Sequence, residues 1–225
     1  MKSIALRYSS LLQEQSYLYN LILGFTLLIV SFIINNYASA YATQMVSQPV
    51  SDLILDSLNL RDVTFIHVYA ALNFWLLFSL YILIYRPGTL PFICKTGALF
   101  ILVRSGFICL THLGAPLNNL TIPSFSSFFI YNGDLFFSGH VGGPFLLALL
   151  FWQQTTLRYF YLFVSLFFAY IVLVGHIHYS IDVAAAPFIT YGVYQFARYF
   201  FDGDYDYFKK ECAENKPVQA IKILD

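Results

Sequence analysis

The residues best suited to chemistry lie in one short segment, residues 175–182, which reads Gly-His-Ile-His-Tyr-Ser-Ile-Asp. If the turn after His178 is helical, Asp182 lies four residues further on and shares a helix face with His178. The carboxylate of Asp182 would then accept a hydrogen bond from one imidazole nitrogen. The other nitrogen of His178 is thereby directed as a nucleophile or a base.

A second candidate segment, residues 132–143, reads Asn-Gly-Asp-Leu-Phe-Phe-Ser-Gly-His-Val-Gly-Gly. It places His140 at the start of an apolar run, beside glycines that permit the close approach of a ligand or of another backbone. Ser138 is a candidate hydrogen-bond donor to a phosphate, although serine at a helix start is more often an N-cap. We expect His140 to meet His178 and Asp182 in one site.

The third candidate is Arg104, which lies midway along an otherwise apolar run. An arginine inside a membrane-spanning helix is costly unless it is paired or faces a polar cavity, so it is a functional candidate. The helical rise places Arg104 about 12 Å from His112, at the end of the same run. Its side chain would then reach toward a phosphate held by the histidines.

The composition indicates that these residues are carried by a membrane protein. Of the 225 residues, 59% are hydrophobic, 20% aromatic and only 11% charged, whereas soluble domains carry about 25% charged residues. The net charge is zero, and no basic patch, Gly-rich phosphate loop or dinucleotide motif is present, which excludes nucleic-acid and nucleotide-binding classes. The three cysteines lack the paired spacing of a disulfide framework or a zinc knuckle.

Six apolar runs are long enough to be membrane-spanning helices. They cover residues 17–37, 64–85, 90–112, 135–152, 159–175 and 181–201. The first run also resembles a signal peptide followed by a small-residue cleavage site, but it is long for one, and we favour a retained helix. We expect an all-α, polytopic protein in which residues 1–225 form a single membrane domain and residues 202–225 a cytoplasmic tail with a solvated acidic start.

The charged residues indicate an orientation. Most of the 12 basic residues lie on the side of the termini, which is therefore expected to be cytoplasmic. They are Lys2, Arg7, Arg86, Lys95, Arg158, Arg198, Lys209, Lys210, Lys216 and Lys222. All five histidines (His67, His112, His140, His176 and His178) lie near the opposite ends of the spans. We therefore expect the site to face the periplasmic, extracellular or luminal side.

The two histidine segments resemble the signature motifs of sphingomyelin synthases and their bacterial relatives, a C-terminal-type branch of the type 2 phosphatidic acid phosphatase (PAP2) superfamily. The family motif Gly-Asp-Tyr-Leu-Phe-Ser-Gly-His aligns with residues 133–140, and His-Glu-His-Tyr-Thr-Ile-Asp aligns with residues 176–182. Weaker similarities occur in the same order at residues 49–52 and 104–116. The resemblance covers residues 49–201. It suggests a bacterial relative of the family and implies a PAP2-like helical bundle.

The resemblance implies a membrane lipid phosphatase or phosphotransferase that needs no cofactor or metal. His178 would attack the phosphorus of a phospholipid or lipid phosphate to give a phosphohistidine, with Asp182 orienting it. His140 would protonate the leaving alkoxide and then deprotonate the acceptor, either water or a lipid hydroxyl. The expected substrate-binding residues are Arg104, Ser138, Asp134 and His176. The expected partners are the lipid substrate and the bilayer.

Two other functions stay open. Ile177 stands where animal sphingomyelin synthases have glutamate, and cations are scarce, which leaves a non-catalytic lipid transporter or scaffold that retains the fold. The spacing of His176, His178 and Asp182 also suits zinc or manganese, as in a metal-dependent membrane hydrolase. A single histidine at a span end is more often an interfacial anchor than a catalyst, and we interpret His67 in this way.

Overall fold

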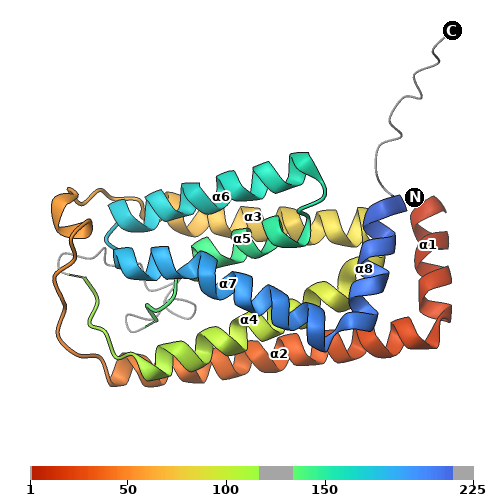
Figure 1. Cartoon of the computed structure of the whole chain (residues 1–225), viewed down its shortest axis with the longest axis horizontal. Coiled ribbons are helices and arrows are strands. Elements are labelled where there is room, and N and C mark those ends of the chain that lie inside the picture. Colours follow the sequence, from red (N-terminus) through yellow and green to blue (C-terminus); the bar gives the residue numbers. More distant parts are fainter. Residues whose placement is uncertain (1, 117–133, 215–225) are drawn as a thin grey trace, which may run out of the picture.

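The computed structural model describes residues 2–116 and 134–214, and within these ranges the chain is helical without strands (Figure 1). This confirms the all-α prediction for the described residues. The α-helices are α1 (Lys2–Gln13), α2 (Gln15–Gln44), α3 (Thr64–Tyr85), α4 (Leu90–Leu110), α5 (Gly139–Leu150), α6 (Thr155–Val174), α7 (Ser180–Phe200) and α8 (Asp202–Glu214). Two short 3-10 helices, η1 (Leu55–Ser57) and η2 (Pro87–Thr89), lie before α3 and α4.

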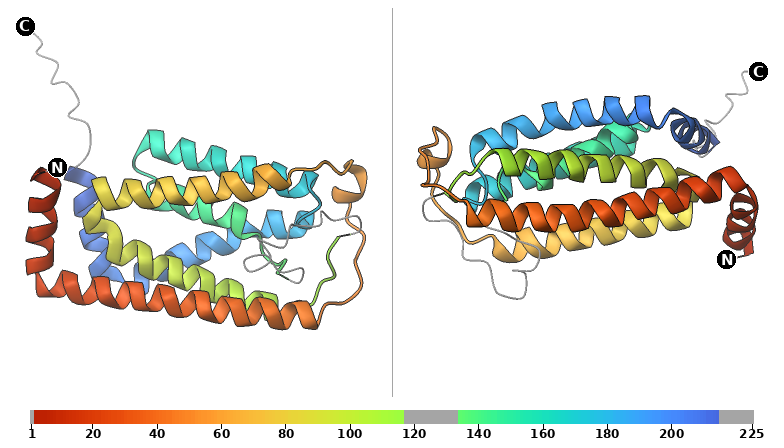
Figure 2. Two further views of the ribbon diagram at one scale, coloured as in Figure 1. Left: turned by 180° about the vertical axis from the view of Figure 1, so that it is seen from behind. Right: turned by 90° about the horizontal axis from the view of Figure 1, so that it is seen from below.

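Helices α2 to α7 run along the long axis of the molecule, whereas α1 and α8 lie across one end (Figures 1 and 2). We call this the α8 end. The connection that contains η1 and the turn between α6 and α7 lie at the opposite end, which we call the histidine end. The first and last described helices therefore lie at the same end of the molecule, as they would if the chain crossed a membrane an even number of times.

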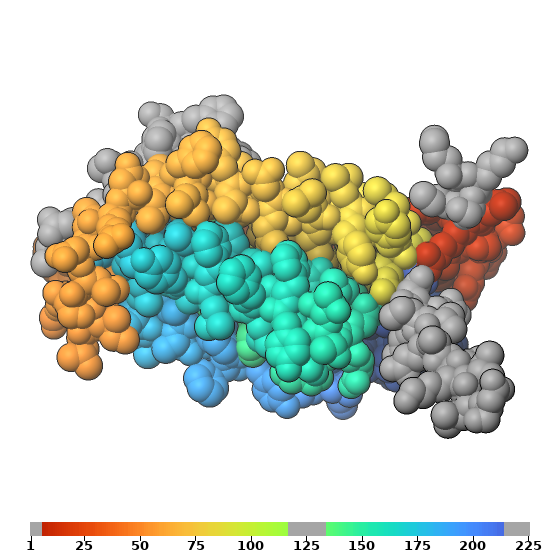
Figure 3. Space-filling model, turned by 90° about the horizontal axis from the view of Figure 1, so that it is seen from above, coloured from red at the N-terminus to blue at the C-terminus, as the bar shows by residue number. Residues whose placement is uncertain are grey.

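Four helices in the described part of the chain are long and apolar enough to cross a membrane: α2, α3, α6 and the segment Pro87–Leu110, which contains α4. On one face of the molecule α3 and α6 lie side by side (Figure 3). Large apolar side chains are exposed along both helices, among them Leu77 on α3 and Leu166 on α6. Apolar helices with apolar exposed surfaces are the pattern of an integral membrane protein.

The prediction of six spans is not confirmed, because the fourth and sixth apolar runs do not give candidate membrane-spanning helices. Helix α5 has only 12 residues, about 18 Å at the helical rise, which is too short for a bilayer core of about 30 Å. Helix α7 is long enough, at 21 residues, but it carries Asp182, Gln195 and Arg198 among its apolar residues.

Helix α5 is apolar because it is buried inside the bundle. Nine of its residues are buried, and it packs mainly against α6 and α7. A helix that is hydrophobic all round belongs in a protein core as much as in a membrane. Two glycines allow this packing: a Cβ at Gly142 would lie 2.8 Å from Oγ1 of Thr190, and one at Gly143 would lie 2.7 Å from the Trp75 ring.

Helix α8 is held against the bundle by buried charges. Nζ of Lys95 on α4 lies 2.5 Å from Oδ2 of Asp204, and both side chains are only 5% exposed. Arg7 on α1 pairs with Glu211 further along α8. The expectation of a solvated acidic start to the tail is therefore wrong for Asp204. The prediction that residues 202–225 are cytoplasmic is not tested, and residues 215–225 lie outside the described part.

Candidate active site

The turn between α6 and α7 brings His178 and Asp182 together. Helix α6 ends at Val174, and α7 begins at Ser180. Nδ1 of His178 lies 3.4 Å from Oδ2 of Asp182, the i to i+4 contact that their spacing predicts. The two residues are 4% and 0% exposed, respectively. An ionised Asp182 requires the proton of His178 on Nδ1, which leaves Nε2 with a lone pair.

Asp182 is itself held in place. Its Oδ2 accepts a hydrogen bond from the backbone N–H of Tyr179, at 3.0 Å, which caps the first turn of α7. A carboxylate at this position also interacts favourably with the positive end of the helix dipole. The cap and the histidine contact therefore use the same oxygen, and both orient the carboxylate toward His178.

Asp52, in the connection between α2 and α3, supports the same turn. Its Oδ2 accepts hydrogen bonds from the backbone N–H and the hydroxyl of Ser180, at 2.7 and 2.8 Å. Its Oδ1 accepts from the N–H groups of Ile54 and Leu55. Burial alone would raise the pKa of this carboxyl, but hydrogen bonds from Leu55, Ser180 and Ile54 hold the pKa below its ordinary value. Asp52 therefore fastens the start of α7 as an ionised group.

His176 contacts the segment that follows η1. Its backbone has a φ of 49°, and its Nε2 lies 3.2 Å from the carbonyl oxygen of Leu58. This contact connects the α6–α7 turn to the segment after η1. A role for His176 in binding substrate stays a prediction.

The segment before α5 lies directly against the start of α7. The backbone N–H of Ser138 donates a hydrogen bond of 3.1 Å to the carbonyl oxygen of Asp182. This bond joins the two segments that carry the candidate histidines. His140 follows in the first turn of α5 and lies within electrostatic reach of His178. The two segments therefore meet through their backbones, and a common site for His140, His178 and Asp182 stays a prediction.

Arg104 supports the segment that leads to His140. Its Nε donates to the carbonyl oxygen of Phe137 at 2.9 Å, and its Nη2 lies 2.5 Å from Oδ1 of Asp134. The other oxygen of Asp134 accepts a hydrogen bond from Ser39 on α2, at 3.0 Å. These contacts hold residues 134–138 in a non-helical conformation, which is why α5 begins only at Gly139. They also explain why an arginine is tolerated midway along α4.

His67 is a residue of this site that the sequence interpretation missed. It lies in the first turn of α3, is only 2% exposed, and its ring centroid is 4.2 Å from that of His140. His178 also lies within electrostatic reach of His67. The interpretation of His67 as an interfacial anchor is therefore wrong. The available signal was its position at the same end of the bundle as the other histidines.

Several buried polar atoms at this site have no hydrogen-bond partner among the described residues. They are Oγ of Ser138, Oδ1 of Asp182 and Nδ1 of His67. Leaving such an atom unpaired costs about 1–3 kcal/mol, so native proteins rarely do so away from functional sites. Ser138 is at the N-cap of α5 but makes no side-chain capping bond. Its hydroxyl is therefore free to donate to a ligand.

The described residues do not form a metal site. Within residues 2–116 and 134–214, no three histidine, cysteine or acidic side chains are grouped as metal ligands would be. His176, which a ligand set with His178 and Asp182 would need, is directed instead at the Leu58 carbonyl.

Comparison with known proteins gives one match. No curated protein and no solved structure matches the chain. Residues 132–199 match the family model described as PAP2 superfamily C-terminal. This range contains Ser138, His140, His178 and Asp182 and spans helices α5, α6 and α7. The match shows that this part of the chain is similar to the C-terminal region of the PAP2 superfamily, and it does not separate the sphingomyelin synthase-like branch from others.

Proposed function

We propose that the protein is a membrane lipid phosphatase or phosphotransferase that works through a phosphohistidine on His178. The observation that carries the proposal is the buried pair of His178 and Asp182, joined through the Ser138–Asp182 backbone bond to the segment of His140. This arrangement supplies a directed imidazole nitrogen, a group that orients it and a second imidazole for proton transfer. The donor is a phospholipid or a lipid phosphate, as in the sphingomyelin synthase-like branch.

In the first step, Nε2 of His178 forms a bond to phosphorus while the bond from phosphorus to the leaving oxygen breaks. His140 gives its proton to that oxygen, so the leaving group departs as an alcohol. Asp182 accepts a hydrogen bond from Nδ1 of His178 throughout and stabilises the positive charge that develops on the ring.

In the second step, the acceptor hydroxyl attacks the phosphorus and gives its proton to His140. The bond between phosphorus and Nε2 breaks, and both histidines return to their starting protonation states. Water as the acceptor makes the reaction a hydrolysis, and a lipid hydroxyl makes it a transfer. The same two histidines serve both outcomes, so the acceptor is decided by what reaches the site.

Two further residues are suited to hold the phosphate. The hydroxyl of Ser138 is buried and has no described partner. Arg104 lies against the start of α5, since a Cβ at Gly139 would be 3.3 Å from its Nε. Its positive charge acts on His140 and would stabilise the negative charge of the phosphoryl group in transit. Asp134 partly neutralises Arg104, so its role is to position the arginine.

The test is turnover of defined lipids by the purified protein in detergent or liposomes. Phosphatidic acid and phosphatidylcholine serve as donors, with diacylglycerol or ceramide as the added acceptor, and released phosphate, headgroup and new lipids are measured. His178→Ala should reduce turnover by at least about 10³-fold. His112→Ala is the matched control, because His112 contacts Tyr41 and takes no part in the proposed steps. It should retain turnover.

The same assay separates an enzyme from a lipid transporter or scaffold. Ile177, which stands where animal sphingomyelin synthases have glutamate, packs in an apolar cluster with Val63, Ile171 and Val174. Its hydrophobicity therefore does not disturb the His178–Asp182 pair. Equal turnover by the parent protein and by His178→Ala would remove the proposed nucleophile, and lipid movement that survives loss of both His140 and His178 would favour the transporter.

A further inference from the structure

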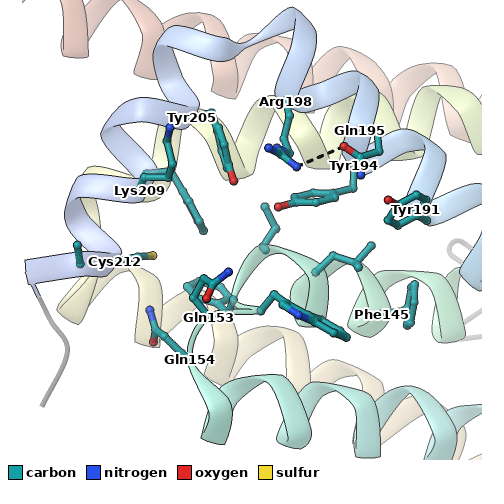
Figure 4. A pocket seen from close by; sticks show the side chains of 16 residues that line it. Phe145, Gln153, Gln154, Tyr191, Tyr194, Gln195, Arg198, Tyr205, Lys209 and Cys212 are labelled. Carbon is teal, nitrogen blue, oxygen red and sulfur yellow. Dashed lines mark hydrogen bonds between the residues drawn. The ribbon is translucent and has the colours of Figure 1, made fainter. Parts of the chain in front are cut away.

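A cavity lies at the α8 end of the bundle, far from the histidines. Helix α7 joins the two ends: Asp182 is in its first turn and Arg198 in its last, a separation of about 24 Å at the helical rise. Near Arg198 the structure has a cavity of about 620 Å³ between α5, α7 and α8 (Figure 4). This volume is in the range of sites that hold small molecules.

The cavity lies beside the end of α5. Helix α5 ends at Leu150, whereas α7 continues to Phe200 and α8 then crosses the end of the bundle. Side chains of α5, of the turn that follows it, of α7 and of α8 line the cavity. Its wall is largely apolar or aromatic, with Phe145 and Leu149 from α5, Trp152 from the following turn and Tyr191 from α7.

The side chains that line the cavity differ in exposure. The side chains of Trp152 and Tyr191 are 44% and 52% exposed. Other lining side chains are buried, among them Leu149, Phe151 and Phe208. An apolar chain that enters from the bilayer would thus be covered progressively by protein, which favours the apolar part of a lipid.

The charged groups that line the cavity are cationic. Arg198 and Lys209 line it, and no carboxylate is among the described lining residues. Nη1 of Arg198 contacts Oε1 of Gln195 at 3.3 Å (Figure 4), and Arg198 forms no ion pair with any described carboxylate. Lys209 is compensated, because its Nζ lies 2.7 Å from Oδ1 of Asp206 in an exposed pair. The uncompensated positive charge at the cavity is that of Arg198.

The aromatic rings beside Arg198 favour an anionic headgroup over one that carries a quaternary amine or an ammonium. The Arg198 guanidinium lies over the rings of Tyr194 and Tyr205, at 5.5 and 4.9 Å. Nζ of Lys209 lies 4.9 Å from the same Tyr205 ring. The ring faces that would hold a ligand cation are therefore occupied by cations of the protein.

We propose that this cavity binds an anionic phospholipid, with the phosphate at Arg198 and an acyl chain along Phe145, Leu149 and Tyr191. Guanidinium groups bind phosphate oxygens in a bidentate manner, and basic pockets between membrane helices are a recurring way to hold anionic lipids. The site is distinct from the histidine site, because its ligand is bound about 24 Å away along α7.

Trp152 provides a direct readout, because it lines the cavity and the chain has only one other tryptophan, Trp75. The experiment uses full-length protein carrying Trp75→Phe, reconstituted in phosphatidylcholine vesicles. Brominated phosphatidylglycerol or brominated phosphatidylcholine is added at equal mole fractions, and quenching of Trp152 fluorescence gives the relative association of each lipid. Arg158 is kept in all variants, because its guanidinium lies 5.0 Å from the Trp152 ring and would alter its emission.

The expected result is an association of phosphatidylglycerol about fivefold stronger than that of phosphatidylcholine. Arg198→Ala should reduce this ratio to about one, whereas Lys210→Ala, which removes an exposed charge of α8 outside the cavity lining, should leave it unchanged. Equal quenching by the two lipids in the Trp75→Phe protein overturns the proposal, whether or not the Arg198 variant folds. An equal reduction of this association ratio in the Lys210→Ala and Arg198→Ala variants also overturns it, because the attraction would then be a general surface effect.

Discussion

The backbone N–H of Ser138 donates a hydrogen bond of 3.1 Å to the carbonyl oxygen of Asp182. One residue precedes α5 and the other lies in the first turn of α7. This bond fastens the His140 segment to the backbone of Asp182, whose carboxylate orients His178. The site therefore depends on how two helix starts meet, and the predictions below test its parts separately.

Asp182→Asn tests the orienting carboxylate. Asparagine keeps the size of the side chain and an oxygen for the Tyr179 N–H, but it removes the negative charge beside Nδ1 of His178. We expect kcat to fall by about 10²–10⁴-fold with little change in KM. Steady-state kinetics measures kcat and KM, and thermal unfolding measures the stability of the variant. A kcat within about twofold of the parent protein would show that Asp182 acts only as a helix cap.

His67→Phe tests the histidine beside His140. Phenylalanine can retain ring packing at this buried position but has no ring nitrogen. If His67 positions and electrostatically influences His140, kcat should fall by about tenfold and the pH–rate profile should shift, since proton transfer depends on the charge near the acid/base group. His67→Leu should lose activity similarly. An unchanged pH–rate profile in a stable His67→Phe variant would assign His67 a packing role alone.

Asp52→Asn tests the fastening of α7. The carboxylate accepts two hydrogen bonds from Ser180, and loss of such a cap costs about 1–2 kcal/mol. Because the pKa of Asp52 is below its ordinary value of 3.8, the unfolded chain binds the proton more readily. The stabilisation is therefore complete above that ordinary value and is lost as the pH falls through the lower, folded-state pKa.

Thermal unfolding between pH 7 and pH 3 measures this effect. Asp52→Asn should lower the unfolding temperature at pH 7 and make it less sensitive to acid below about pH 4. Asp202→Asn, an exposed carboxylate at the α8 end, is the control and should leave both unchanged. The account of Asp52 is contradicted if its variant keeps the acid sensitivity of the parent protein.

Gly142→Ala tests the packing of α5. A Cβ at Gly142 would lie 2.8 Å from Oγ1 of Thr190 and 2.9 Å from the Phe100 ring. Overpacking costs about 1–3 kcal/mol, which exceeds the gain of about 0.5–1 kcal/mol from replacing glycine in a helix. Gly192→Ala on α7 is the matched control, because a Cβ there meets nothing within 4 Å. The first variant should be less stable than the parent protein, and the second equal or more stable.

The spacing of four residues predicted the contact between His178 and Asp182. His178 precedes α7, which begins at Ser180, and the contact forms at the capped start of that helix. The hydropathy pattern predicted the membrane spans less accurately. It predicted an apolar segment at α5 correctly, but an apolar helix can be buried by protein as well as by lipid, and only packing against α6 and α7 decides between them. Burial explains why α5 is not a candidate span, whereas α7 is excluded by its polar and charged residues.

Contacts between distant segments could not be predicted from one sequence. His67 meets His140 across 73 positions of the chain, and Lys95 finds Asp204 across 109. Both pairs depend on the order in which the helices pack. Single residues were therefore interpreted by their usual roles, as an interfacial histidine and a solvated aspartate, and both interpretations were wrong.

The most direct test of the central claim is to identify the residue that carries the phosphoryl group during turnover. The protein is mixed with phosphatidic acid labelled with ³²P, quenched in base and digested, and the labelled peptide is sequenced by mass spectrometry. Phosphohistidine is labile in acid and stable in base. The account predicts such a label on His178, absent from His178→Ala and retained in His112→Ala. Turnover without any label on His178, or with label in the His178→Ala variant, would contradict it.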